Sequence, residues 1–207
     1  MNIALLGGSG RIGSEVLDML LADDHDVQVL ARSAASVRPA AGLTVTEGDA
    51  LDPASVAAVV KGADAVVSAL GPRGARSPGL LAGAAVITVA AMNDAGVGRL
   101  IAVSAAGAFI GAAPDTGALT KFVLPRVLAK PFADVRRMED VIRASGLEWT
   151  LVRPTRLVGG LATGRYRTRS DFPPQGGTKV SRADVAQFVV DALSQHSWIG
   201  ASPALAY

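Results

Sequence analysis

A glycine-rich loop near the N-terminus constrains the fold of this chain more than any other segment. In LLGGSGRIG, Gly7, Gly10 and Gly13 stand at every third position, directly after the apolar run Asn2–Leu6 and at the start of the helical pattern Ile12–Leu21. Glycines at such a junction permit a tight turn, close packing of helix on strand, and approach of a diphosphate to unpaired N–H groups of the helix. The loop therefore predicts a dinucleotide-binding strand–loop–helix unit, with a purely structural turn as the alternative.

Short apolar runs alternate with helical patterns along most of the chain. Further strands are expected at Val27–Ala31, Leu43–Thr46, Ala65–Ser68, Arg99–Ser104 and Glu148–Val152, and helices at Pro53–Val60, Leu80–Ala95, Phe132–Ser145 and Ser181–Ser194. Near-continuous apolar strands separated by helices are typical of a parallel sheet covered on both faces. The predicted fold class is α/β: a Rossmann-type doubly wound parallel sheet with helices on both faces, in a single domain over residues 1–207.

The composition argues against several kinds of site. The 207 residues are 50% hydrophobic and only 4% aromatic, which indicates one core built mainly from aliphatic side chains. The absence of cysteine excludes disulfides, thiolate metal sites and a cysteine nucleophile, and two histidines argue against a His-rich metal site. No metal is expected. A formal net charge of +2 and the few aromatic side chains argue against nucleic acid as a partner.

No segment predicts a membrane span or an export signal. The longest strongly apolar run, Leu80–Met92, contains Gly83 and is shorter than the roughly 20 residues that cross a bilayer. At the N-terminus, no basic segment precedes the apolar stretch. We therefore expect no membrane partner and a cytoplasmic location.

The end of the second strand indicates which dinucleotide binds. The adenine ribose should lie there, where an Asp or Glu would bind its 2′-hydroxyl and repel a 2′-phosphate. This strand ends instead in VLARS, with Arg32 and Ser33, and Arg11 of the glycine loop can lie nearby. Two guanidinium groups and a hydroxyl suit a 2′-phosphate, so NADP(H) is the predicted cofactor. The alternative is that Arg32 is an ordinary solvated arginine.

Seven motifs occur in a characteristic order over nearly the whole chain: GGSGRIG, LARS, GDALD, VVSALG, LIAVSAAG, SGLEWTLVRPTRL and KVSRADVAQFVVDAL. In this order and spacing the sequence resembles the atypical short-chain dehydrogenase/reductase superfamily. The resemblance is to its NAD(P)H-binding branch, which includes biliverdin-IXβ/flavin reductases and NmrA-like proteins.

The resemblance implies roles for individual residues. It adds Asp49, Ala50, Ala69, Leu70, Gly71, Ser104, Pro154 and Thr155 to the cofactor contacts expected from the glycine loop and the end of the second strand, which are Gly7, Gly10, Arg11, Ile12, Gly13, Arg32 and Ser33. Ser104 matches the active-site serine position of the superfamily, and residues 105–131 and 153–180 would form substrate-side loops. Tyr166 in the second loop is, with Ser104, a candidate catalytic residue. Ordinary packing or solvent exposure is the alternative for Asp49, Ser104 and Tyr166.

One departure from the superfamily bears on the chemistry. Its usual reductases carry a Tyr-x-x-x-Lys pair, but Phe132 and Arg136 stand where the pair would fall, and the only tyrosines are Tyr166 and Tyr207. Phenylalanine has no proton to donate. Hydride transfer to a flavin-like, quinone or other conjugated small-molecule acceptor needs no such pair, which favours an NADPH-dependent reductase.

Two other functions stay open at this point. A non-catalytic NmrA-like NADP(H) redox sensor would act through a protein partner, and an epimerase-type enzyme would retain the cofactor and return its hydride. A monomer or weak homodimer is expected in each case. Residues 151–182 carry six arginines and one lysine against a single acid, Asp171. This excess would attract an anionic acceptor, unless the arginines pair with Asp134, Glu139 or Asp140.

Overall fold

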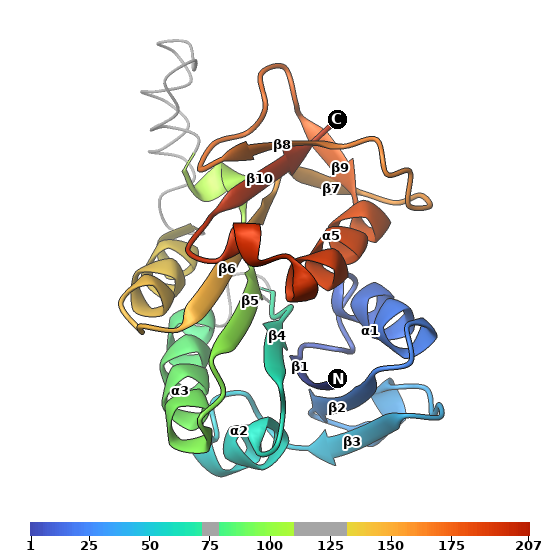
Figure 1. The fold of residues 1–207 in the computed structure, drawn as a ribbon, viewed down its shortest axis with the longest axis vertical. Coiled ribbons are helices and arrows are strands. Elements are labelled where there is room, and N and C mark those ends of the chain that lie inside the picture. Colours follow the sequence, from blue (N-terminus) through green and yellow to red (C-terminus); the bar gives the residue numbers. More distant parts are fainter. Residues whose placement is uncertain (72–78, 110–131) are drawn as a thin grey trace.

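The computed structural model describes residues 1–71, 79–109 and 132–207. One eight-stranded sheet has the order β3-β2-β1-β4-β5-β6-β10-β8 (Figure 1). Its strands are β1 (Asn2–Leu6), β2 (Asp26–Ala31), β3 (Leu43–Glu47), β4 (Ala65–Ser68), β5 (Arg99–Val103), β6 (Glu148–Pro154), β8 (Arg167–Ser170) and β10 (Pro203–Ala206). Neighbouring strands pair in parallel except β8, which runs antiparallel to β10. The predicted single-domain α/β fold with a doubly wound, mostly parallel sheet is confirmed.

The strand order changes direction at β1. From this strand the chain proceeds to β2 and β3 on one side and then crosses to β4, β5 and β6 on the other. Leu6 at the end of β1 pairs with Leu30 of β2 and with Ser68 of β4. These carboxyl-terminal strand ends therefore finish at one edge of the sheet, where ligands of open α/β sheets bind.

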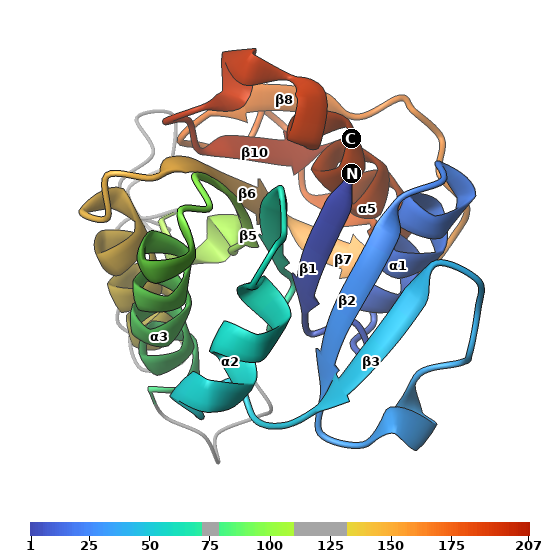
Figure 2. The same cartoon turned by 60° about the horizontal axis from the view of Figure 1, so that its bottom comes forward.

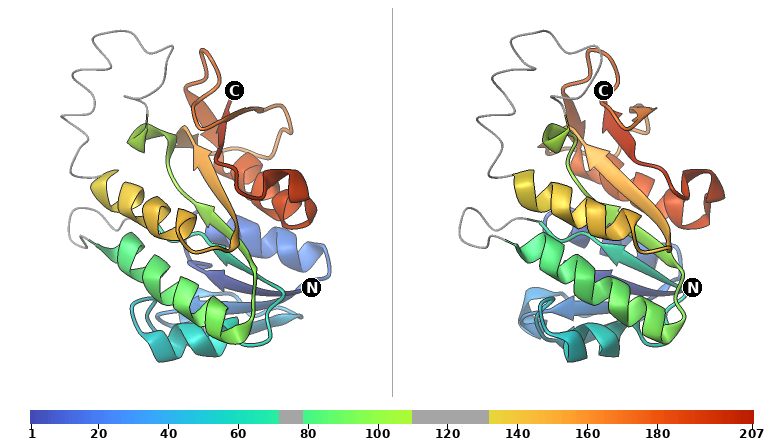
Figure 3. Two further views of the ribbon diagram at one scale, coloured as in Figure 1. Left: turned by 60° about the vertical axis from the view of Figure 1, so that its left-hand side comes forward. Right: turned by 90° about the vertical axis from the view of Figure 1, so that its left-hand side faces the viewer.

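Helices form a layer on each face of the sheet (Figures 2 and 3). One layer contains α1 (Gly13–Ala22) and α5 (Arg182–Ser194); the other contains α2 (Pro53–Val60), α3 (Leu80–Ala95) and the helix of residues 132–143. Along β1, Ile3 and Leu5 pack into the first layer, whereas Ala4 and Leu6 pack into the second. This is the alternation expected of a strand buried on both faces. No helix among the described residues is long and apolar enough to cross a membrane.

Side-chain caps fix where several helices begin. Asp52 accepts a hydrogen bond from the Ser55 amide at 3.0 Å, and Pro53 opens α2 at the residue where the sequence places the start of this helix. The start of α3 has no such cap of its own, because its N-cap residue is Gly79. Asp134 of the helix at residues 132–143 supplies one instead, accepting from the amides of Leu81 at 2.9 Å and Ala82 at 3.2 Å. The two helices are thereby joined beside the edge where the strands end.

The segment expected to be an irregular loop, residues 153–180, contains regular structure. It includes β7 (Arg156–Val158), β8 and the start of β9 (Lys179–Ser181), and β7 and β9 form a separate two-stranded parallel sheet. Strand β10 near the C-terminus was not expected either. These strands are three or four residues long, and the RTRS sequence of β8 is mostly exposed at the sheet edge. Strands β7, β8 and β9 therefore lack the apolar run by which a sequence reveals a buried strand, whereas β10 is buried and apolar but only four residues long and begins with proline. Short 3-10 helices η1 (Ala34–Ser36), η3 (Ala106–Ala108) and η5 (His196–Trp198) complete the described structure.

Candidate functional site

A cleft of about 1100 Å³ lies at the edge where β1, β2, β4 and β5 end. The predicted cofactor residues that line it are Gly7, Gly10, Arg11, Ile12, Arg32, Asp49, Ala50, Ala69, Leu70, Gly71 and Ser104. Lining residues that the sequence analysis did not assign to the cofactor include Leu30, Leu51, Leu81, Val103, Phe132, Val135, Leu157 and Arg182. The fold thus brings together residues from the first third of the chain with Ser104 and with three later segments. The volume of the cleft lies just above the roughly 300–1,000 Å³ of typical small-molecule pockets, which leaves room for an extended ligand such as a dinucleotide.

The glycine loop is packed so tightly that side chains are excluded at two positions. Gly7 has φ +86°, and a Cβ there would lie 2.8 Å from the backbone carbon and oxygen of Ala69. A Cβ on Gly13 would overlap the Gly7 carbonyl oxygen and come within 2.7 Å of the Gly7 carbonyl carbon. Gly13 does not line the cleft itself but lets α1 start directly against the loop. The loop therefore forms a backbone surface that a ligand can approach closely.

Backbone amides at the start of α1 are available to such a ligand. The Gly10 amide bonds to the Gly7 carbonyl at 2.9 Å, and the Ser14 amide bonds to the Gly10 carbonyl at 2.9 Å. Between them, the amides of Arg11, Ile12 and Gly13 have no backbone hydrogen bond among the described residues. Unpaired amides at the positive end of a helix dipole bind phosphate groups. This cradle, closed to any Cβ, fits the diphosphate of a dinucleotide.

Three basic residues, Arg11, Arg32 and Arg182, are among the described residues that line the cleft. Arg11 and Arg32 are exposed, so their guanidinium groups are accessible to a ligand. Asp49, the acidic residue among the described lining residues, follows β3 rather than β2 and accepts a hydrogen bond from the Leu51 amide at 2.9 Å. Arg182, at the start of α5, was missed by the sequence analysis because only the packing of α5 on α1 brings it here. Its Nε lies 3.8 Å from Glu15.

Three further residues predicted to contact the cofactor lie outside the described lining. Ser33 is exposed next to Arg32 and precedes η1. Pro154 ends β6, and Thr155 follows it with its hydroxyl donating to the Leu205 carbonyl at 3.0 Å. Their roles at the cofactor stay predictions. Of the expected loop 105–131, residues 110–131 lie outside the described residues.

Tyr166 packs against α5 and is not among the residues that line the cleft. Its ring meets Phe188 edge to face, with the centroids 6.0 Å apart. Burial raises the pKa of the Tyr166 hydroxyl, and the charges of Asp191 and Asp184 raise it further. A phenol held neutral within the packing of α5 has the environment of a structural side chain, and its catalytic role stays a prediction.

Ser104 reaches the cleft, and its hydroxyl is bonded to the buried ion pair of Glu139 and Arg153. Its hydroxyl donates to Glu139 Oε1 at 2.5 Å. Glu139 accepts from Arg153 Nε at 2.9 Å and from Arg153 Nη2 at 2.5 Å, and these side chains are 1% and 4% exposed. The sequence contains a signal for the burial of Glu139, because this residue falls on the same helical face as Val135 and Ile142, which face the core. Glu139 is thus the partner of one of the arginines in residues 151–182, the alternative that the sequence left open for this basic segment.

Phe132 and Arg136, which are expected to stand where the tyrosine–lysine pair would fall, have different surroundings. Phe132 lines the cleft and packs against Gly107, where a Cβ would lie 2.9 Å from the phenyl ring. Arg136 donates to the Ala108 carbonyl at 2.8 Å and so ties its helix to η3. This wall of the cleft is therefore apolar and contributes no acid through Phe132.

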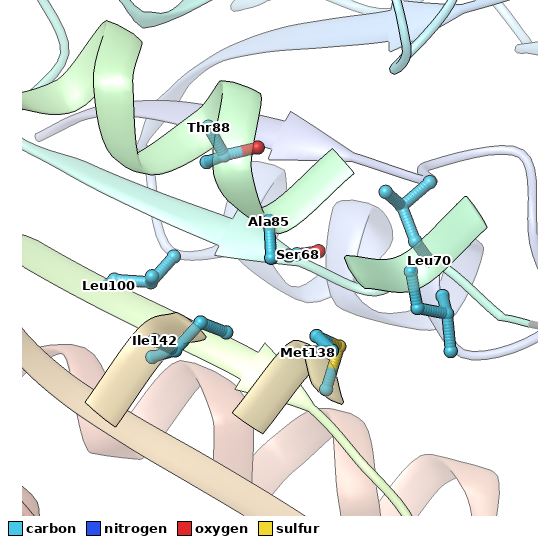
Figure 4. A pocket seen from close by; sticks show the side chains of 8 residues that line it. Ser68, Leu70, Ala85, Thr88, Leu100, Met138 and Ile142 are labelled. Atoms are coloured by element: carbon cyan, nitrogen blue, oxygen red, sulfur yellow. The ribbon is translucent and has the colours of Figure 1, made fainter. Parts of the chain in front are cut away.

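A second, much smaller cavity lies in the interior. Figure 4 shows it between α3, the end of β4 and the helix of residues 132–143, with Ser68, Thr88 and Met138 among its lining. Its volume is about 10 Å³, at the lower limit for a single water molecule. It has no room for a substrate.

Asp184, near the start of α5, forms hydrogen bonds to the segment that precedes this helix and to Tyr207. Its carboxylate accepts from the Thr163 and Gly164 amides at 2.7 and 2.8 Å, and from the Tyr207 hydroxyl at 2.6 Å. Burial opposes its ionisation, but the hydrogen bonds from Tyr207, Gly164 and Thr163 outweigh burial and lower the pKa of Asp184 from 3.8 to about 2. Asp184 thus holds residues 163–164 and the C-terminal tyrosine to the start of α5.

Asp184→Asn is expected to lower the free energy of unfolding at neutral pH by about 2–3 kcal/mol, the usual cost of losing charge-assisted hydrogen bonds. Because its folded-state pKa is lowered, Asp184 stabilises the fold above about pH 4, and this contribution disappears as the pH falls towards 2. The melting temperatures of wild type and variant should therefore become equal in acid.

Asp191→Asn, on the partly exposed side of α5, is the control and should change stability by less than about 1 kcal/mol. A constant gap between wild type and Asp184→Asn from pH 7 to pH 2 would contradict this account.

The chain is similar in sequence and in fold to several known proteins. The sequence profile of a family described as NAD(P)H-binding matches residues 7–196. An NAD(P)H azoreductase from Xenophilus azovorans is 30% identical over 203 residues, which cover 93% of this chain and 63% of that protein. A Burkholderia pseudomallei protein of known structure, provisionally described as exported, is 30% identical with a TM-score of 0.82 over 100% of both chains. A Veillonella parvula short-chain dehydrogenase/reductase solved in complex with NADP shares the fold, with 23% identity and a TM-score of 0.81 over 100% and 94% of the two chains.

Proposed function

Because the chain belongs to the NAD(P)H-binding family, we propose that it is an NADPH-dependent oxidoreductase that reduces a conjugated small-molecule acceptor. The observation that carries the proposal is the glycine cradle at the start of α1, where a Cβ on Gly7 or Gly13 would collide with backbone. The cradle fits a diphosphate, and the cleft continues from it over the ends of β4 and β5 to Ser104. When bound, the nicotinamide would supply the hydride.

The preference for NADPH rests on the end of β2. Arg32 follows Ala31 at the point where the adenine ribose should lie, and Arg11 of the glycine loop also lines the cleft. Guanidinium groups bind phosphate oxygens through paired donors, whereas an acid at this point would repel a 2′-phosphate. Ser33 adds a hydroxyl beside Arg32. NADP(H) is therefore the cofactor proposed for this cleft.

A flavin-like, quinone, azo or tetrapyrrole compound is the proposed class of acceptor. Such compounds accept a hydride at a conjugated system and can take their proton from solvent, which suits a cleft wall formed by Phe132. The similarity to an azoreductase over nearly the whole chain supports the same class. The protein's own residues would then bind the acceptor, hold it against the nicotinamide and limit the access of water. A cytoplasmic monomer or weak homodimer stays a prediction.

The test is to follow the absorbance of NADPH, and of NADH in parallel, with FMN, a naphthoquinone, biliverdin and an azo dye as acceptors. We expect turnover with at least one of the four and faster turnover with NADPH than with NADH. Binding of NADPH with no turnover of any acceptor would contradict the reductase proposal and favour the redox-sensor alternative.

A further inference from the structure

The hydrogen of the Ser104 hydroxyl is already engaged inside the protein. Ser104 Oγ lies 2.5 Å from Glu139 Oε1, so one hydrogen lies between these oxygens. Both Glu139 oxygens also accept from Arg153, at 2.9 Å through Nε and at 2.5 Å through Nη2. A guanidinium has donors only, so both oxygens of Glu139 act as acceptors toward Arg153. The shared hydrogen must therefore come from Ser104.

The ion pair that imposes this orientation is rigidly held. Glu139 is 1% exposed and Arg153 is 4% exposed, and breaking a pair buried to this extent would leave an uncompensated charge. Arg153 also donates to the Asp171 carbonyl at 2.7 Å and stacks on Phe109, with its guanidinium carbon 3.6 Å from the ring centroid. Arg143 contributes a longer contact to Glu139 Oε2 at 3.4 Å. The carboxylate therefore cannot turn away from Ser104 without loss of several contacts.

We propose that Glu139 and Arg153 are positioning residues that make Ser104 a hydrogen-bond acceptor toward the cleft and not a proton donor. A hydroxyl has one hydrogen and two lone pairs, and once the hydrogen is engaged only lone pairs are left for a ligand. Ser104 would then select a ligand group with an N–H donor at the end of β5. It would not protonate the acceptor. This inference rests on the proposed function and specifies the polarity of its site.

The sheet order limits which part of the ligand can reach Ser104. With the diphosphate at the end of β1 and the 2′-phosphate toward β2, the nicotinamide half extends toward β4 and β5. The N–H donor at Ser104 belongs either to the carboxamide of the nicotinamide or to the acceptor bound beside it, such as the N3–H of a flavin. Both sources have the same chemistry and can be separated by omitting one donor at a time.

The test compares probes that differ only in this donor. Dissociation constants are measured for NADP+ and its 3-acetylpyridine analogue, and for FMN and N3-methyl-FMN added to the protein saturated with NADP+. In one of the two pairs, wild type should bind the N–H probe about fivefold more tightly, as expected for one hydrogen bond. Ser104→Ala should bring this ratio close to one, and Glu139→Gln should reduce it because the hydroxyl can then rotate. Asp140→Asn, an exposed carboxylate on the same helix, is the control and should leave the ratio unchanged.

The outcomes separate this inference from the proposed function. If Glu139→Gln does not fold, wild type and Ser104→Ala alone decide the question. Equal ratios in wild type and Ser104→Ala for both pairs of probes would overturn the polarity assigned to Ser104 while leaving NADPH binding intact. Failure of wild type to bind any of the dinucleotides would overturn the proposed function and this inference with it.

Discussion

Gly13→Ala is expected to weaken NADPH binding by about tenfold to a hundredfold, since forcing an atom into a packed site typically costs about 1–3 kcal/mol. The added Cβ would overlap the Gly7 carbonyl oxygen and lie 2.7 Å from its carbon, and both partners are backbone that cannot rotate away. Either the glycine loop or the start of α1 must shift, which misaligns the amides of Arg11 and Ile12. Calorimetric titration with NADPH, together with the melting temperature, measures both effects.

Gly98→Ala is the matched control for this substitution. Gly98 lies between α3 and β5, and a Cβ there has no heavy atom within 4 Å. It should bind NADPH as wild type does. Wild-type affinity in Gly13→Ala would show that the junction of loop and helix does not hold the diphosphate.

Arg32→Asp is expected to reverse the choice of cofactor. NADPH affinity should fall by about a hundredfold, because charge-assisted hydrogen bonds are worth about 1.5–3 kcal/mol and the new carboxylate repels a 2′-phosphate. NADH affinity should change by less than about threefold, since a carboxylate at this point can accept from the ribose 2′-hydroxyl. The measurement is the ratio of the two dissociation constants in wild type and variant at one ionic strength.

Arg137→Asp makes the same change of charge at an exposed residue of the helix at 132–143. It should leave the ratio of NADPH to NADH affinity unchanged. A parallel loss of affinity for both dinucleotides in Arg32→Asp would mean that Arg32 contacts the shared part of the cofactor and does not read the 2′-phosphate.

Strong local signals made most of the fold predictable. The glycine loop, the apolar run of β1 and the cap at Asp52 each identify an element without reference to distant residues. Strand β10 has no such signal, because four residues including Pro203 do not form a recognisable pattern. Its place in the sheet comes from pairing with β6 and β8, which are separated from it in sequence.

The candidate site likewise contains some residues that could be predicted from local sequence and others that could not. Residues of the glycine loop and Arg32 follow directly from their strands, so their position at the sheet edge could be predicted. Glu139 is 35 residues from Ser104 in sequence. Its burial depends on the ion pair with Arg153 of β6, which the sequence of its own helix does not reveal. The arginines of residues 151–182 were expected either to attract an anionic acceptor or to pair with acids such as Glu139, and Arg153 is the buried partner of Glu139. Only three-dimensional packing reveals that these charges serve Ser104.

The most direct test of the central claim is isothermal titration of the wild-type protein with NADPH, NADP+, NADH and NAD+. A cleft built around a diphosphate cradle and two arginines should bind one dinucleotide per chain and prefer NADPH to NADH by at least about tenfold, the effect of one charge-assisted hydrogen bond. Absence of binding heat for all four dinucleotides, confirmed by an unchanged melting temperature, would contradict the assignment of this cleft to a nicotinamide cofactor.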